Sequence, residues 1–425
     1  MISTGSLKAC VLASAYALAA FPAHAEAPDP AAVVRTYADI ALATYEDALT
    51  GAKALNEATD ALIVNPTQAN LEKARIAWRA ARPAYQQTEA FRFGNPVVDD
   101  WEGRVNAWPL DEGLIDYVAP SYGTGSDVNS LYVANVIANR QITIGGEVVD
   151  TSEITPELLR DKLQEAGDVE ANVATGYHAI EFLLWGQDLH GTGPGAGERP
   201  ASDYSRTECT NGNCDRRGEY LNAATDLLIA DLEEIVENWR SGGAARAVVE
   251  DDPARGVSAI FTGLGSLSYG ELAGERMKLG LLLHDPEEEH DCFSDNTHAS
   301  HFNDVIGIRN VYTGRYVRLD GSVMEGPSVS ALVAAKDPAA DAELRARIED
   351  SVKAMGAIVA AAEDGEAYDQ QIAEGNEAGN ARVQAAIDAL VAQTRAIERA
   401  VAATGAGGVS IEGSDSLDNT DAVFQ

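Results

Sequence analysis

The amino-acid sequence predicts an all-α protein built from two helical-bundle-like domains. Apolar residues recur at intervals of three, four and seven over long stretches, which is the spacing of amphipathic helices. The segment at 141–149 (QITIGGEVV) has instead the pattern of a small β-hairpin insertion. The chain has 425 residues, 45% of them hydrophobic, so it can fill the cores of two ordinary domains.

The expected helices follow one another along the chain, each defined by an apolar stripe and its stop signals. Asn65-Pro66 ends the first helix, Pro83 kinks the second, and Gly145-Gly146 turns the hairpin. A Gly- and Pro-rich break at 190–200 separates two halves. The expected helices span residues 31–64, 67–94, 156–187, 218–240, 253–283, 328–362 and 366–403.

These signals also divide the chain into segments of different kinds. We expect an export signal at 1–25, helical domains at 26–205 and 206–405, and a flexible tail at 406–425. The signal has Lys8, an apolar run and the small-x-small site Ala23-His24-Ala25. No later run is long and apolar enough to span a bilayer, so we expect a soluble periplasmic or otherwise exported protein without membrane insertion.

The two halves share a short sequence similarity. NEATDALI at 56–63 and NAATDLLI at 222–229 match at six of eight positions, each in the helix that opens its half. Duplication of one helical unit and coincidence of composition both explain this match.

The charge balance excludes two classes of partner. Asp and Glu number 67 against 31 Lys and Arg, which gives a formal net charge of −36. Nucleic acids and anionic membranes both need clustered Lys and Arg, so we expect neither as a partner.

Three cysteines follow the export signal. Cys209 and Cys214 lie in a polar loop, TECTNGNCDRR, where an oxidising compartment favours a local disulfide. A metal is the alternative for this spacing, although no nearby Cys or His completes a zinc site. Cys292 is left without an obvious partner.

The strongest candidate site lies in the segment 171–188 (ANVATGYHAIEFLLWGQD). This segment is apolar on nearly all sides, so a helix here is buried, yet it contains His178 and Glu181. Their i,i+3 spacing puts both side chains on one helix face, where burial is costly unless they pair or bind a metal. Imidazole and carboxylate suit iron, zinc or manganese, and the alternative is a buried pair that satisfies only itself.

A carboxylate from another segment would complete such a metal site. Glu89 closes the second helix and is the candidate third ligand, held by Arg92; a salt bridge capping the helix end is the alternative. Asp111 lies in an irregular segment beside a bulky aromatic residue and is a candidate lining residue.

Two further segments offer lining residues. The polar segment 284–301 (HDPEEEHDCFSDNTHASH) concentrates histidines and carboxylates, among them His290, Asp291 and His298. Weak divalent-cation binding is one interpretation, with His298 as a candidate lining residue, and a solvated loop is the alternative. The helix before it carries Gly256, Gly263, Gly270 and Gly274, whose spacing indicates a seam approached by another backbone. Glu275 flanks that seam and is a candidate lining residue.

The segment TGYHAIEFLLWGQD contains a G-x-H-x-x-E motif and resembles the imelysin family, in its iron-regulated protein A branch. The blocks AWRAARPAYQQTEAFRFG, NAWPLDEGLIDYV, SYGELAGERM and HDCFSDNTH support the resemblance in matching order. The resemblance implies an exported bacterial protein connected with iron uptake or sensing, in which the motif helix lines a cleft between two helical domains. It makes His178 and Glu181 the expected metal ligands.

We favour a non-catalytic metal-binding protein for iron uptake or handling. It would bind a divalent or ferric ion, iron first and zinc second, and serve cell-envelope iron-uptake components as partners. A periplasmic metallopeptidase using the same site is one alternative, but the chain lacks H-E-x-x-H and H-x-x-E-H, and we assign no catalytic residue. A helical interaction module with a purely structural His178–Glu181 pair is the other alternative.

Overall fold

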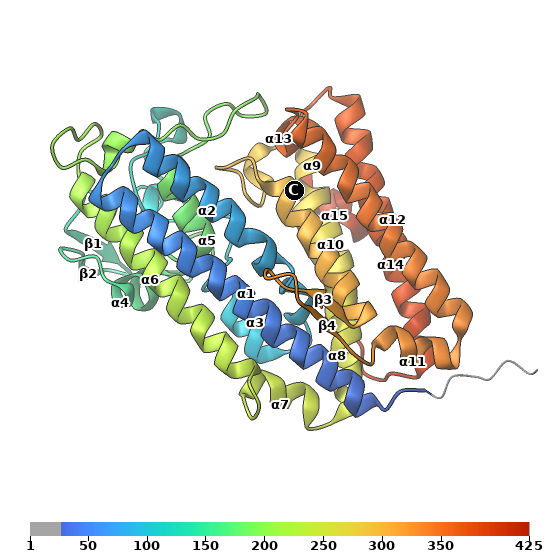
Figure 1. The fold of residues 1–425 in the computed structure, drawn as a ribbon. Helices are drawn as coiled ribbons and strands as arrows, with labels where there is room; N and C mark the ends of the chain where they lie inside the picture. Colours follow the sequence, from blue (N-terminus) through green and yellow to red (C-terminus); the bar gives the residue numbers. More distant parts are fainter. Residues whose placement is uncertain (1–26, 425) are drawn as a thin grey trace, which may run out of the picture.

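Helices make up most of the protein in the computed structural model, which describes residues 27–424 (Figure 1). The strands in this range form two short antiparallel hairpins, so the all-α prediction is confirmed. The predicted export signal lies outside the described residues. No helix within 27–424 combines the length and the hydropathy that crossing a membrane requires.

The N-terminal bundle is built around α1 (Pro30–Val64), which packs along α2 (Gln68–Gln86) and α6 (Cys214–Trp239). Asp29 precedes α1 and caps its first turn, where its side chain accepts the backbone N–H of Ala31. α5 (Gly176–Trp185) packs against both α2 and α6, and all of its residues are buried. This agrees with a sequence that is apolar on nearly all sides.

The C-terminal bundle contains one long, segmented helix and three others. The long helix runs through α8 (Pro253–Ser266), a π-helical segment (Leu267–Lys278) and α9 (Leu279–Leu283); the others are α10 (Thr297–Thr313), α12 (Pro338–Glu363) and α14 (Glu377–Thr404). α12 packs on α10 and α14. The two bundles meet where α10 packs on α2 and α8 packs on α1.

Short elements connect and cover these bundles. They are α3 (Pro96–Glu102), α4 (Pro156–Leu158), α7 (Ala244–Glu250), α11 (Val329–Lys336), α13 (Tyr368–Ile372), α15 (Asp415–Asp418), β1 (Gln141–Ile144), β2 (Glu147–Asp150), β3 (Arg315–Val317) and β4 (Val323–Glu325). The β1–β2 hairpin, with Ile142 opposite Val149, is the predicted one. The β3–β4 hairpin lies in a stretch where no strand was expected.

The structure differs from the expected helix boundaries in the middle of the chain. The helix expected over 156–187 is interrupted, because the helical run ends at Leu163: Gln164 is extended, with a ψ of 123°, and Glu165 has a positive φ of 53°. α6 lies beyond the predicted domain boundary at residue 205, yet it packs along α1. The two-domain division therefore stays a prediction.

The C-terminal tail packs against the glycine seam instead of projecting from the fold. A Cβ on Gly270 would lie 2.8 Å from the Glu412 carbonyl oxygen, and the Glu412 amide donates to Ser266 Oγ at 3.1 Å. Seven residues earlier along the seam, a Cβ on Gly263 would lie 2.6 Å from the carbonyl oxygen of Ala90. The predicted close approach of other backbones is thus confirmed.

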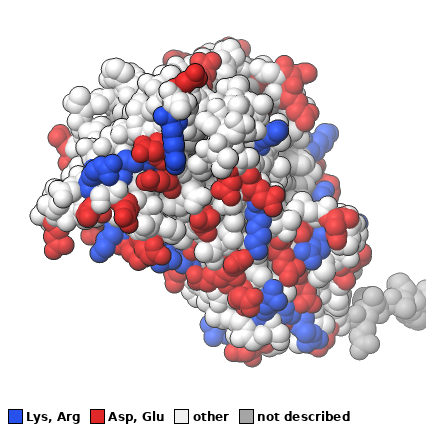
Figure 2. Space-filling model, turned by 60° about the vertical axis from the view of Figure 1, so that its left-hand side comes forward, with Lys and Arg blue, Asp and Glu red and all other residues white. Residues whose placement is uncertain are grey.

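The disulfide predicted between Cys209 and Cys214 is present, and Cys292 is free. On the surface, acidic side chains are spread among basic ones, and no basic patch dominates the face in Figure 2. This distribution agrees with the excess of carboxylates in the composition.

Candidate metal centre

α5 is positioned by its first residue, Gly176. This glycine has a φ of 80°, and a Cβ there would lie 2.4 Å from the carbonyl oxygen of Val105. The next residue, Tyr177, donates its backbone N–H to the same oxygen at 2.8 Å. The glycine of the G-x-H-x-x-E motif therefore lets the helix start pressed against Val105, and this contact fixes where His178 lies.

His178 and Glu181 contact each other on the buried face of α5. His178 Nδ1 lies 3.1 Å from Glu181 Oε2, and the other oxygen, Oε1, accepts the backbone N–H of Ser294 at 3.0 Å. Both oxygens of Glu181 are therefore engaged. His178 Nε2 is buried and has no hydrogen-bond partner among the described residues.

The loop between α9 and α10 brings His290 and Asp291 to His178. One potential ligand atom from each of the three residues lies within 4.8 Å of the other two, and the His178 and His290 ring centroids are 4.7 Å apart. Glu181 is not part of this group. From the sequence, His290 and Asp291 belong to a polar segment considered for weak cation binding and are not connected with His178, because only the fold carries their loop across to α5.

Arg82 on α2 holds this loop in place. Its Nη2 donates to Asp291 Oδ1 at 2.8 Å, and its Nη1 donates to Asn106 Oδ1 at 2.7 Å. The amide nitrogen of Asn106 then faces His290 Nε2 at 3.4 Å, so one arginine orients two members of the group. His290 Nδ1 has no partner within the described part of the chain.

Burial keeps the two imidazoles of the group neutral. It lowers the pKa of His178 to about 3, with a further contribution from the Arg82 charge, and lowers that of His290 well below its usual range. Burial is the largest single influence on Asp291 and would raise its pKa, but the Arg82 charge together with the hydrogen bonds from Ser300 and Asn296 lowers this pKa to about 2. Burial, with the nearby Asp291 charge, raises the pKa of Glu181 well above its usual range.

The predicted third ligand, Glu89, lies in a neighbouring cluster. Its Oε2 accepts from Arg276 Nη2 at 2.6 Å, and Arg276 also contacts Asp304 on α10 at 3.3 Å. His301, one turn before Asp304, is fully buried; its Nδ1 lies 3.9 Å from Asp304 Oδ2, and neither of its ring nitrogens has a hydrogen-bond partner among the described residues. The structure thus brings Glu89 to an arginine and not into the His178 group, and its role as a ligand stays a prediction.

The predicted lining residues are scattered. Arg92 forms a salt bridge with Asp99 at 2.9 Å, whereas Glu89 pairs with Arg276, so the Glu89–Arg92 pairing considered from the sequence is not found among the described ion pairs. Asp111 accepts from Asn129, and Glu275 is exposed. His298 is half-buried on α10 and does not belong to the group of three.

Comparison with known proteins places this geometry in context. The model of the Imelysin (Peptidase_M75) family matches residues 41–397. Iron-regulated protein A of Synechococcus elongatus is 40% identical over 76 residues, which is 18% of this chain and 21% of that protein, so the match spans about a fifth of the relative.

Two crystal structures resemble the fold. An iron-regulated protein A precursor from Parabacteroides distasonis has a TM-score of 0.64 at 19% identity, covering 89% of this chain and 96% of that one. An imelysin-like protein from Psychrobacter arcticum has a TM-score of 0.56 at 15% identity, covering 88% and 96%. At these identities, the likeness concerns the fold alone.

Proposed function

The chain belongs to the imelysin family, and from this premise we propose that it is an exported metal-binding protein that handles iron. We place its metal centre at His178, His290 and Asp291. The name of the Synechococcus relative supports the link to iron, and the predicted export signal supports the location. In this role the ion would be cargo, passed to or from iron-uptake components of the cell envelope.

The observation that carries the proposal is the pair of buried imidazole nitrogens without partners, His178 Nε2 and His290 Nδ1. A buried polar atom left without a hydrogen bond costs about 1–3 kcal/mol. Two such atoms within one small group, beside an ionised carboxylate, form a donor set that a metal ion would satisfy.

The residues take distinct roles in this proposal. His178 would bind through Nε2, because Nδ1 is engaged by Glu181. Glu181 is then the carboxylate that orients the imidazole, as such partners do in known metal sites, and not a direct ligand. Arg82 would orient Asp291 and offset its charge in the core. Two imidazoles and one carboxylate favour iron, zinc or manganese over calcium.

Burial favours metal handling over peptide cleavage. Only 1% of His178, none of Glu181 and 2% of His290 are exposed, so no polypeptide substrate reaches the centre in this conformation. Both oxygens of Glu181 are already occupied, Oε2 by His178 Nδ1 and Oε1 by the backbone N–H of Ser294. A metallopeptidase needs a poised base and an open ligand position, and this arrangement favours neither.

Elemental analysis of the purified mature chain tests the proposal. We expect about one iron or zinc ion per chain, lost in His178→Ala and in His290→Ala and retained in the matched control His190→Ala, whose ring is 37% exposed. Circular dichroism checks that each variant is folded. Unchanged occupancy in His178→Ala would overturn the proposal. Equal loss of thermal stability in His178→Ala with and without metal would support the structural alternative.

A further inference from the structure

A concave site separate from the metal centre lies around the C-terminal end of α5. It is a cavity of about 420 Å³, a size typical of small-molecule sites, and no residue of the His178 group lines it. Its walls come from three separate segments, at 117–120, 185–190 and 196–200, and from Asn211 in the disulfide loop. Apolar side chains, among them Trp185 and Leu189, form much of the wall.

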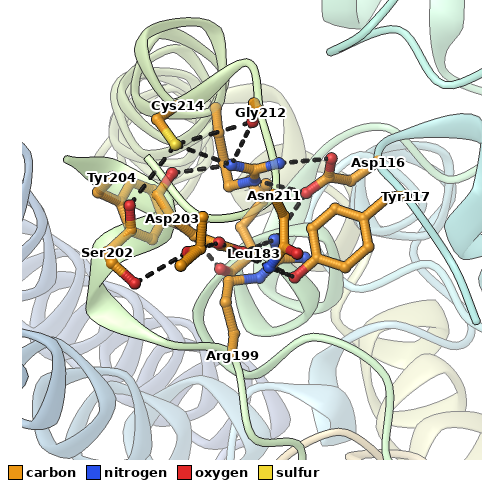
Figure 3. A network of polar contacts seen from close by, with 12 residues as sticks. Asp116, Tyr117, Leu183, Arg199, Ser202, Asp203, Tyr204, Asn211, Gly212 and Cys214 are labelled. Carbon is orange, nitrogen blue, oxygen red and sulfur yellow. Dashed lines mark hydrogen bonds and ion pairs between the residues drawn. The ribbon is translucent and has the colours of Figure 1, made fainter. Parts of the chain in front are cut away.

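Arg199 lies in this wall and is almost entirely buried, with an exposed fraction of 4%. One nitrogen, Nη1, donates to Asp116 Oδ2 at 2.7 Å and to Asp203 Oδ2 at 3.2 Å (Figure 3). The guanidinium carbon lies 5.0 Å from the ring centroid of Tyr117 and 5.3 Å from that of Phe182. Nη1 and the flat faces of the guanidinium therefore already have protein partners.

The remaining edge of the Arg199 guanidinium has none. Nε and Nη2 are buried and have no hydrogen-bond partner among residues 27–424. They are the two donors of one edge, the fork that binds a carboxylate through two parallel hydrogen bonds. Gly186, which also lines the cavity, lies beside this edge: a Cβ there would be 3.7 Å from Nε.

The cluster around Arg199 is stable without a ligand. Arg217 donates to Asp116 through Nε at 2.6 Å and through Nη2 at 3.0 Å, so two arginines face two aspartates. Asp203 also accepts from Tyr117 and from Asn211, at 2.7 and 2.8 Å. These bonds fix the position of the guanidinium, so the unpaired Nε and Nη2 of Arg199 do not need to be ordered when a ligand binds.

We propose that this cavity binds a small organic carboxylate with an apolar body. The carboxylate would accept two hydrogen bonds from Arg199 Nε and Nη2, and the apolar body would lie against Trp185 and Leu189. Two unpaired parallel donors bind a carboxylate more tightly than an analogue that cannot accept both hydrogen bonds. The site is independent of the metal centre and of the function proposed for it.

Calorimetric titration with benzoate tests this site, with benzamide as a neutral analogue of the same shape. We expect benzoate to bind the full mature chain with one site and benzamide to bind at least tenfold more weakly. Ala196→Phe adds a bulky side chain to the cavity wall, leaves the charged residues of the cluster unsubstituted, and should abolish benzoate binding. Arg199→Gln should reduce it at least tenfold, whereas the exposed matched control Arg240→Gln should leave it unchanged.

The outcomes separate this site from the metal centre. Benzoate affinity should be unchanged in His178→Ala and in the presence of a chelator. Equal affinities for benzoate and benzamide, or undiminished binding in Ala196→Phe, would overturn the proposal. Ala196→Phe also keeps the test decisive if Arg199→Gln does not fold, because that variant leaves Arg199, Asp116 and Asp203 in place.

Discussion

Replacing Gly176 by alanine tests the physical reason for the glycine in the G-x-H-x-x-E motif. The variant Gly176→Ala adds one methyl group at a φ of 80°, in the path of the Val105 backbone. The added Cβ would lie 2.4 Å from the Val105 carbonyl oxygen and 2.5 Å from its carbonyl carbon, closer than Cβ atoms come in real proteins. The start of α5 must therefore move, and His178 must move with it.

The expected cost has two parts. A left-handed conformation costs an alanine about 1–2 kcal/mol relative to glycine. Forcing a methyl group into a packed core adds about 1–3 kcal/mol, because the backbone of Val105 is held by its own bond to the Tyr177 amide. Together, Gly176→Ala should lower the free energy of unfolding by about 2–5 kcal/mol, a large fraction of the stability of an ordinary protein.

Urea denaturation followed by circular dichroism measures this loss, and elemental analysis of the same samples measures the metal content. Gly242→Ala is the matched control, since Gly242 has a φ of 83° and no atom within 4 Å of the added Cβ. The control should lose only about 1–2 kcal/mol. If Gly176→Ala loses no more stability than Gly242→Ala and keeps its metal, the reasoning on this contact is wrong.

Three further predictions concern other parts of the chain. Glu181→Gln should weaken metal binding by about 10- to 100-fold in a competition titration while the protein stays folded. The reason is that the variant weakens the contact that orients the His178 imidazole but removes no ligand. Unchanged metal affinity would contradict the orienting role of Glu181. Burial, opposed by Arg92, raises the pKa of Glu102 from 4.5 to about 7. Protonated Glu102 therefore stabilises the fold fully below pH 4.5, and this contribution, about 3 kcal/mol at most, is lost as the pH rises through 7. Urea denaturation at a series of pH values should show a smaller decline in the free energy of unfolding for Glu102→Gln than for the unchanged protein. Reducing the Cys209–Cys214 disulfide and capping the freed thiols should lower the free energy of unfolding by about 2 kcal/mol, and an unchanged urea midpoint after this treatment would refute the estimate.

Periodicity predicted the helices where the apolar stripe is strong and failed where the buried face of a helix carries polar residues. α1, α2, α6, α12 and α14 each have one apolar face, and their patterns identified them. α10 was missed because its buried face carries polar residues, Ser300, His301 and Asp304, which look like a solvated loop in the sequence. The tail was expected to be flexible because its contacts with the glycine seam are invisible in its own composition.

The same distinction applies to the candidate site. The order of residues along the chain is enough to place His178 beside Glu181, since residues three apart on a helix share a face whatever surrounds them. The packing of the helices is needed to bring His290 and Asp291 to them, through an ion pair between Arg82 and Asp291, 209 residues apart in the chain. The same packing sets Glu89 against Arg276. Local spacing fixes neighbours within a turn, whereas contacts between distant segments depend on how whole helices pack.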